Sequence, residues 1–332
     1  MAGAMPSADS AAGVSGLVTR RWQLLDPLLP PFGAGPPHSG APLVVGGQDG
    51  PVAVGWCEHW TAEPGSLDPS WIAARRFQLS AAVADPGVTN GLDRLLALWR
   101  DHLATLPEAR DADTAAVVNW PSRDADGVSA LLRHGLDPLE VLAARTGPRR
   151  PSAGAPGEVP NGPVLHAGGP HDIRRAGPAD TEAVVRLGLE LVRFDSRFGA
   201  VHERPDTQAA LRREVAGLLA GAAPWTWVAE RDGEVVAVLA AQRPQQAGWI
   251  APMVALAPAA YLMLMFVAPG ERGGGAGSAL VDVFHREADA AGVAVTLLHY
   301  LQLNPLSVPF WNRHGYRPLW TSWQAKPASE MR

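Results

Sequence analysis

Residues 267–278 (VAPGERGGGAGS) are the segment of this chain best suited to holding a phosphate group. They follow an apolar stretch from Tyr261 that is typical of a buried strand, and they precede a stretch over residues 278–290 with helical spacing. Backbone N–H groups at a helix start lack partners within the helix, and the helix dipole adds partial positive charge there. Glycines let an anion approach the backbone closely, and Arg272 adds a forked cationic donor. We therefore predict an anion-binding loop between this strand and this helix.

The spacing within this segment distinguishes three kinds of phosphate-binding loop. A P-loop ends in Gly-Lys-Ser/Thr, but the only lysine of the chain is Lys326. A dinucleotide-binding G-x-G-x-x-G that begins at Gly273 would need glycine at Ser278. The spacing that fits is Arg-x-x-Gly-x-Gly, with Arg272, Gly275 and Gly277 in the defined positions. On its own, this short motif is also compatible with a glycine-rich connection that binds nothing.

A second segment, further along the chain, supports the binding interpretation. After another apolar, strand-like stretch over residues 293–300, five residues occur at positions 0, 3, 7, 11 and 12 of a pattern: Asn304, Ser307, Trp311, Gly315 and Tyr316. The two segments, in this order and at this spacing, resemble the Gcn5-related N-acetyltransferases (the GNAT superfamily), which transfer an acyl group from acyl-CoA to an amine.

The resemblance implies a donor site between two adjacent parallel strands that splay apart. The backbone of Phe266 and Val267 would pair with the pantetheine arm of acyl-CoA. The loop would hold the pyrophosphate through Arg272, Gly273, Gly275, Ala276, Gly277 and Ser278. Asn304 would bind the pantetheine or phosphate region, and Ser307 and Trp311 would line the CoA channel.

The catalytic groups depart from the family pattern. Trp311 stands where the family usually has an acidic Tyr, and its indole N–H donates a hydrogen bond without usefully transferring a proton, so we expect a packing role. Tyr300 or Ser307 could replace that acid. The strand before the loop offers no carboxylate as a base, which leaves other residues as candidates: Glu230, His299, Asp195, His202 and Glu203. His299 and Tyr300 alternate along one strand, so only one of them can face the cleft. The ordinary alternative for His299 is a histidine packed in the core. For the segment that holds Asp195, His202 and Glu203, the ordinary alternative is a solvated helix end and loop.

The order of the expected strands and helices indicates two copies of one α/β unit. We expect a disordered N-terminus (1–16), a degenerate GNAT-like domain (17–145), a Pro/Gly-rich linker (146–170) and a catalytic domain (171–326), each domain a mixed central sheet with splayed parallel strands flanked by helices. Asp124, Gly127, Leu131 and Gly135 repeat the second pattern at an offset of 180 residues. The first copy has lost its phosphate chemistry, since Val88, Asp93 and Asp124 replace Arg272, Gly277 and Asn304.

Composition excludes several other classes of function. The 332 residues are 47% hydrophobic and 18% charged, with a formal net charge of −5, so there is no overall basic field for nucleic acid or an anionic membrane. The apolar runs are too short to span a bilayer, and no basic start precedes an apolar core as in a signal peptide. Cys57 is the only cysteine, so we expect a buried structural thiol, no metal and a cytoplasmic protein.

These features predict an acyl-CoA-dependent N-acyltransferase that acts on a small-molecule amine such as an amino sugar, an amino acid or an antibiotic. Tandem members of the family that acylate aminosugars support this choice, and we expect a monomer or homodimer. The alternative is a non-catalytic acyl-CoA-binding sensor, favoured by the missing acid and base. Acetylation of a protein amine is a third possibility, but no feature of the sequence indicates a groove for a peptide.

Overall fold

The chain folds around one mixed sheet of 11 strands, in the order β1-β2-β3-β4-β11-β5-β10-β9-β8-β7-β6. The computed structural model describes residues 8–33, 38, 41–47, 50–84, 88–147, 170–199, 201–221 and 223–332. The strands are β1 (Leu43–Gly47), β2 (Gly50–Thr61), β3 (Arg75–Val83), β4 (Thr114–Pro121), β5 (Asp137–Thr146), β6 (Asp172–Arg175), β7 (Thr226–Arg231), β8 (Glu234–Gln242), β9 (Ala259–Val267), β10 (Val295–Leu301) and β11 (Arg317–Ala325). The helices are α1 (Ala8–Leu25), α2 (Asp68–Trp71), α3 (Val88–Ala104), α4 (Ala125–Arg133), α5 (Thr181–Asp195), α6 (Thr207–Leu219), α7 (Ala276–Ala290) and α8 (Ser307–Arg313).

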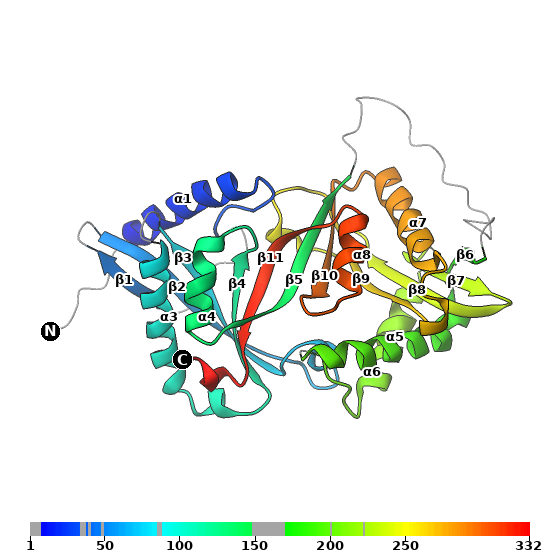
Figure 1. Cartoon of the computed structure of the whole chain (residues 1–332), viewed down its shortest axis with the longest axis horizontal. Coiled ribbons are helices and arrows are strands. Elements are labelled where there is room, and N and C mark those ends of the chain that lie inside the picture. Colours follow the sequence, from blue (N-terminus) through cyan, green and yellow to red (C-terminus); the bar gives the residue numbers. More distant parts are fainter. Residues whose placement is uncertain are drawn as a thin grey trace.

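The two halves of the chain exchange their last strands at the centre of the sheet. Strand β5 belongs to the first half by sequence, but it pairs with β10 of the second half, in antiparallel register from Glu140↔Leu301 to Thr146↔Val295. Strand β11 of the second half pairs in the same way with β4 of the first half. The two exchanged strands also pair with each other, and they lie side by side in the middle of Figure 1. The strand order is therefore nearly symmetric about the β5–β11 pair.

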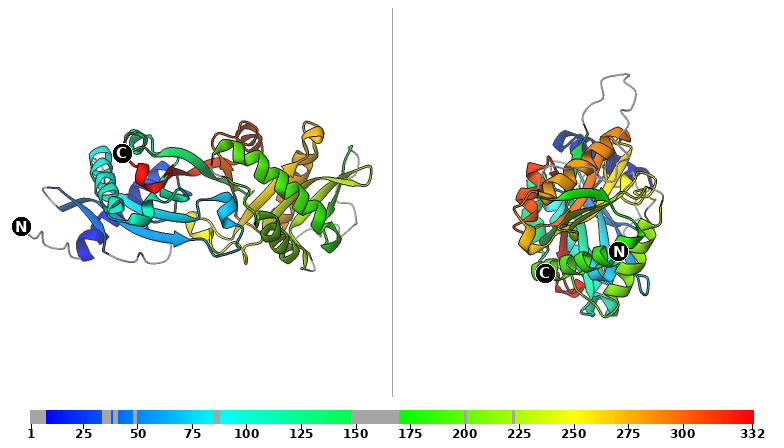
Figure 2. Two further views of the ribbon diagram at one scale, coloured as in Figure 1. Left: turned by 90° about the horizontal axis from the view of Figure 1, so that it is seen from below. Right: turned by 90° about the vertical axis from the view of Figure 1, so that its right-hand side faces the viewer.

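Helices cover both faces of this sheet. On one face, α3 and α4 pack against the first half, around Trp99 and Leu131, while α7 and α8 pack against the second half, around Phe284 and Trp311. On the other face lie α1 over the first half and α5 with α6 over the second. Figure 2 shows a molecule elongated along the sheet, with the two halves end to end. Within the described residues, no helix combines the length and the hydropathy needed to cross a membrane.

The strand from Tyr261, the helix over residues 278–290 and the strand over residues 293–300 lie where the sequence pattern predicted them, and the structure differs at two of the expected boundaries. Residues 8–16 are helical, because α1 begins at Ala8 and inserts Val14 into the core, with 3% of its surface exposed. Thr146 ends strand β5, so the linker does not begin there. Residues 1–7 and 148–169 lie outside the described part of the chain. The division into domains at residues 17–145 and 171–326 stays a prediction, since each of these halves lends a strand to the other.

Candidate functional site

The glycine loop joins β9 to α7, as the sequence predicted. A short 3-10 turn at Pro269–Glu271 leads into an exposed stretch, in which Gly273 and Gly275 have φ values of 83° and 89°. These left-handed conformations are accessible to glycine at little cost. Gly277 lies in the first turn of α7, where an added Cβ would come within 2.9 Å of Met265 Cε and 3.4 Å of Val267 Cγ2. The missing side chain therefore lets the start of α7 rest directly on β9.

Strands β9 and β10 separate next to this loop. Their parallel ladder contains four residue pairs and ends at Leu262↔Leu298. On its other side, β9 pairs with β8, and the register shifts because Leu262 and Leu264 oppose consecutive residues of β8. Met263 is therefore the extra residue of a β-bulge, a feature that bends a strand and ends regular pairing. The segment from the bulge to Val267 continues without a ladder to β10, which provides the gap between splayed strands that the resemblance implied.

Arg272 folds back onto β9. Its Nε donates a hydrogen bond to the Val267 carbonyl at 3.1 Å, and its guanidinium lies over the rings of Phe194 and Phe266, at 4.7 Å and 5.2 Å from their centroids. The neighbouring Glu271 accepts hydrogen bonds from His171 Nε2 at 2.9 Å and from Arg231 at 3.0 Å. These two partners lower the pKa of the Glu271 carboxyl, and they pair its negative charge beside the loop.

Asn304 and Asp195 meet at the end of β10. The Asn304 amide donates to Asp195 Oδ1 at 3.1 Å, while its own oxygen accepts from the backbone N–H groups of Leu306 and Ser307. Asn304 therefore fixes the start of α8 and ties it to the end of α5. Burial raises the pKa of Asp195 to about 6, against the opposing effect of the Asn304 hydrogen bond and with a smaller contribution from the charge of Glu140.

His299 lies at the point where the two strands part. It follows Leu298, the last β10 residue paired with β9, and its Nδ1 lies 2.9 Å from the hydroxyl of Tyr261. Burial, and after it the charge of Glu140, raises the pKa of Tyr261 well above its usual value, so the hydroxyl stays neutral. Tyr300 points to the opposite face of the sheet, into the core under α7 and α8. Of the two alternating residues, His299 faces the side of α5 and α6.

Two of the proposed catalytic residues lie in unsuitable places. Glu230 is on β7, two strands away from β9, where Arg174 binds it together with Asp180. An ion-paired carboxylate near the sheet edge cannot serve a gap between β9 and β10, so Glu230 is corrected to a structural residue. His202 is exposed and its Nε2 lies 3.1 Å from Lys326 Nζ. Burial and this cation lower the pKa of His202, and nothing places it next to the gap.

The remaining predicted residues differ in exposure. Trp311 is 7% exposed and makes edge-to-face contacts with Phe310 and Tyr316 at 4.9 Å and 5.4 Å, which is the packing role expected of it. Ser278 is exposed at the start of α7, and its hydroxyl lies 3.2 Å from His314 Nε2. Ser307 begins α8. Glu203 is bound by Arg193 at the surface, through two hydrogen bonds of 2.7 Å and 2.8 Å.

The corresponding position in the first half lacks both the bulge and the asparagine. Strands β3 and β4 form a parallel ladder from Arg75↔Thr114 to Leu79↔Val118, but the β2–β3 ladder has no register shift, so β3 has no counterpart of the Met263 bulge. Asp124, at the position of Asn304, is 1% exposed and accepts two hydrogen bonds from Arg21 at 2.5 Å and 2.6 Å. Residues 85–87, in the loop before α3, lie outside the described residues, as does the side chain of Val88.

Three charged residues on the face opposite α7 were not among the candidates predicted from the sequence. Glu140 lines a cleft of about 630 Å³ between the halves, together with residues such as Ala73, Gln324 and Lys326. The Nε atom of Arg76 is buried without a hydrogen-bond partner, and burial lowers the Arg76 pKa despite the opposing charges of Glu140 and Asp68. Only the fold brings these residues together.

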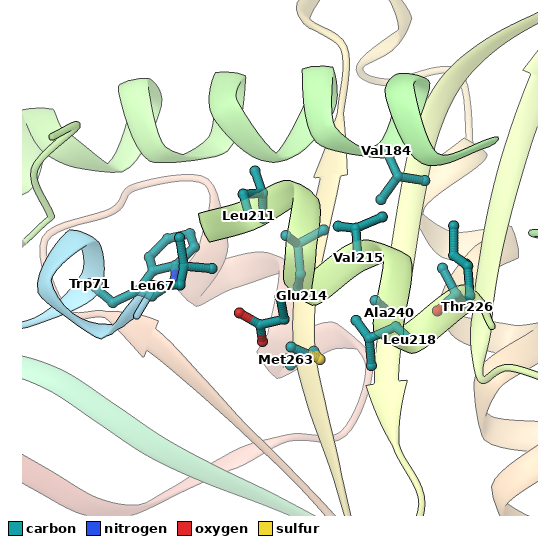
Figure 3. Close-up of a pocket in the computed structure, with 12 residues that line it drawn as sticks. Leu67, Trp71, Val184, Leu211, Glu214, Val215, Leu218, Thr226, Ala240 and Met263 are labelled. Carbon is teal, nitrogen blue, oxygen red and sulfur yellow. The ribbon is translucent and has the colours of Figure 1, made fainter. Parts of the chain in front are cut away.

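Glu214 is the third of these residues, and it lies in an apolar pocket beside the bulge (Figure 3). The pocket has a volume of about 40 Å³ and is lined by Trp71, Val215, Met263 and Leu264 among others. Burial raises the pKa of the Glu214 carboxyl. Its spacing along α6 would have revealed it, because residue 214 falls within the apolar stripe of residues 210, 211, 215 and 218.

Comparison with known proteins agrees with this geometry. Residues 224–318, which span β7 to the start of β11, match the family model described as an acetyltransferase (GNAT) domain. These residues form a GNAT acetyltransferase domain. The chain is therefore an acyltransferase. The donor loop, the bulge and the splayed strands all lie within its GNAT domain. No curated protein sequence matches it.

Solved structures extend the likeness of fold beyond the GNAT domain. A GCN5-related N-acetyltransferase from Sphaerobacter thermophilus is similar over 98% of this chain and 95% of its own, with 15% identity and a TM-score of 0.51. A GCN5-related N-acetyltransferase from Kribbella flavida covers 99% of this chain and 100% of its own, with 15% identity and a TM-score of 0.43. The first likeness shows that both halves together, and not the GNAT domain alone, form a recurring fold.

Proposed function

We propose that the protein is an acyl-CoA-dependent N-acyltransferase for a small-molecule amine. The observation that carries this proposal is the gap between β9 and β10, which begins at the Met263 bulge and lies beside the exposed glycine loop of α7. The loop suits the pyrophosphate of CoA through its helix-start N–H groups. The free edge of β9 at Phe266 and Val267 suits the amide groups of the pantetheine arm, which can pair with it as a strand would.

His299 is proposed as the base. When the Tyr261 hydroxyl accepts a hydrogen bond from Nδ1–H, the other ring nitrogen keeps its lone pair. That nitrogen takes a proton from the attacking amine as the new C–N bond forms at the thioester carbonyl. The C–S bond then breaks and releases the CoA thiolate. A thiolate with a conjugate pKa of about 8.5 leaves without an obligatory acid, which is consistent with Trp311 in the place of a tyrosine.

The pocket beside the bulge favours a short acyl group. It is adjacent to Met263 and Leu264, where the two strands part, and its volume is about 40 Å³. A cavity of roughly 10–15 Å³, measured as the space open to a water-sized sphere, holds one water molecule, so this pocket accommodates an acetyl or similar group and not a long chain. Acetyl-CoA is accordingly the first donor to test.

The cleft between the halves is proposed to admit the amine. Glu140 there and Asp195 at the end of β10 supply negative charge that attracts an ammonium group. Arg76 lies close enough to Glu140 for the two charges to interact, and its buried, unpartnered Nε is costly unless a ligand satisfies it. This favours an acceptor that carries an anionic group as well as its amine.

The test is turnover of acetyl-CoA by the purified full-length chain. The panel of amines should pair each amino acid with its amide, and each aminosugar with the corresponding aminosugar acid. The readout is release of the CoA thiol, above a constant background of one thiol from Cys57. We expect release with at least one amine, and faster release for the member of a pair that carries a carboxylate. Calorimetry that shows tight CoA binding without turnover of any amine or acyl length would favour the sensor function instead. Absence of both would overturn the proposal.

A further inference from the structure

Three metal-ligating side chains converge in the first half, far from the donor loop. Cys57 and His59 are two residues apart on β2, so both point to the same face of the sheet. Helix α3 packs on that face and carries His102 in its last turn. One ligand atom from each residue lies within 4.8 Å of the other two. A strand and a helix thus present a thiol and two imidazoles to one point.

The ligand set selects a particular class of metal. Sulfur and imidazole nitrogen suit zinc and related transition metals and not calcium or magnesium, which prefer oxygen. In a tetrahedral zinc site, bond lengths of about 2.0–2.3 Å place neighbouring ligand atoms roughly 3.5 Å apart. Separations of up to 4.8 Å therefore need only side-chain rotations. His59 is exposed, which leaves the fourth position open to water.

The surroundings of the sulfur also suit a metal site. Trp99, one helical turn before His102, donates its indole N–H to Cys57 Sγ at 3.2 Å. Hydrogen bonds of this kind orient a ligating sulfur and stabilise its negative charge. Within the described residues, neither His59 nor His102 forms an ion pair, so no carboxylate competes with a metal for these rings.

We infer that Cys57, His59 and His102 bind one zinc-like transition-metal ion that clamps α3 onto β2. The sequence predicted no metal, because the single cysteine Cys57 has no second cysteine with which to form a metal cluster. The two histidines lie 2 and 45 residues away from Cys57 in the chain, and only the packing of α3 on the sheet brings all three together. The site is independent of the donor loop, so it stands whether or not the proposed acyl transfer does.

The test uses the single cysteine as the reporter. Chelator-treated full-length protein is titrated with zinc chloride while the rate of Cys57 modification by a thiol reagent and the thermal midpoint are followed. We expect one equivalent of zinc to slow the modification at least tenfold and to raise the midpoint. Cobalt should produce a thiolate-to-metal charge-transfer band.

The exposed His59 provides the decisive variant, because His59→Ala removes a ligand without opening the core. It and His102→Ala should each weaken zinc binding at least tenfold, while His38→Ala, a change outside the group, should leave it unchanged. Zinc that binds equally well to the wild type and to both ligand variants, or that leaves Cys57 fully reactive, would overturn the inference and identify an adventitious ion elsewhere.

Discussion

Replacing Asp195 with Asn should stabilise the protein, and the gain should depend on pH. The folded chain raises the pKa of this carboxyl from 3.8 to about 6, so the folded state binds the proton more tightly than the unfolded chain does. Stability from this group is fully present at low pH and is lost as the pH rises through about 6. The difference of 2.2 pKa units corresponds to up to about 3 kcal/mol at pH 8, and to roughly half of that at pH 5. Asparagine removes the charge and keeps an oxygen that can accept from Asn304.

The assay is urea unfolding of the wild type and of Asp195→Asn at pH 5 and pH 8, with Asp206→Asn as the control. Asp206 is an exposed carboxylate that precedes α6 and makes no capping hydrogen bond. We expect the control to change the free energy of unfolding little at either pH. A gain for Asp195→Asn that is the same at both values, or a loss of stability at pH 8, would show that burial does not destabilise this charge.

Three further predictions concern the donor loop, the base and the degenerate half. Arg272→Glu should weaken CoA binding at least tenfold in calorimetry, because it removes the hydrogen bond to the Val267 carbonyl and places a negative charge beside the phosphates. Arg286→Glu, a charge reversal at an exposed position later in α7, should leave the affinity unchanged. Equal affinities of the two variants for CoA would refute the phosphate-binding role of the loop. His299→Ala should lower kcat by 10²–10⁴-fold, the usual contribution of a general base, with CoA affinity unchanged, and full turnover would exclude His299 as the base. Arg21→Ala leaves the buried Asp124 carboxylate unpaired, and it should lower the free energy of unfolding in urea by about 3–5 kcal/mol while CoA binding stays unaltered. A decrease below about 1 kcal/mol would mean that the pair is not buried as described.

Local patterns in the sequence predicted the strands and the helix on either side of the glycine loop, because each depends on the periodicity of its own residues. The glycine loop and the strand before it are an example, since the run of apolar residues and the Arg-x-x-Gly-x-Gly spacing are both local. The bulge at Met263 was not predicted. A bulge normally shows as a break in the alternation of polar and apolar residues, but every residue from Tyr261 to Val267 is apolar, so no alternation existed to be broken.

Features that depend on distant partners could not be predicted from these patterns. The contact of Asp195 with Asn304 joins residues 109 positions apart, and the exchange of β5 and β11 depends on which neighbour each strand selects. Both strands carry the residues of a central strand, and nothing in their composition identifies the half they complete. Glu140 acquires its place at the cleft, near the charge of Arg76, because β5 joins the centre of the sheet, which is why neither residue stood out in the sequence.

The exchanged strands have a consequence for the connection between the halves. A chain severed anywhere between residues 147 and 170 would give two fragments, each holding one strand that the other needs to complete its sheet. Strand β5 would remain between β10 and β11, and β11 between β4 and β5. The fragments should therefore stay associated and retain the donor site, whereas the second fragment produced alone would expose the edge of β10. The first half thus cannot be removed without loss to the second, because its strand β5 covers the edge of β10 as a strand of a partner subunit would.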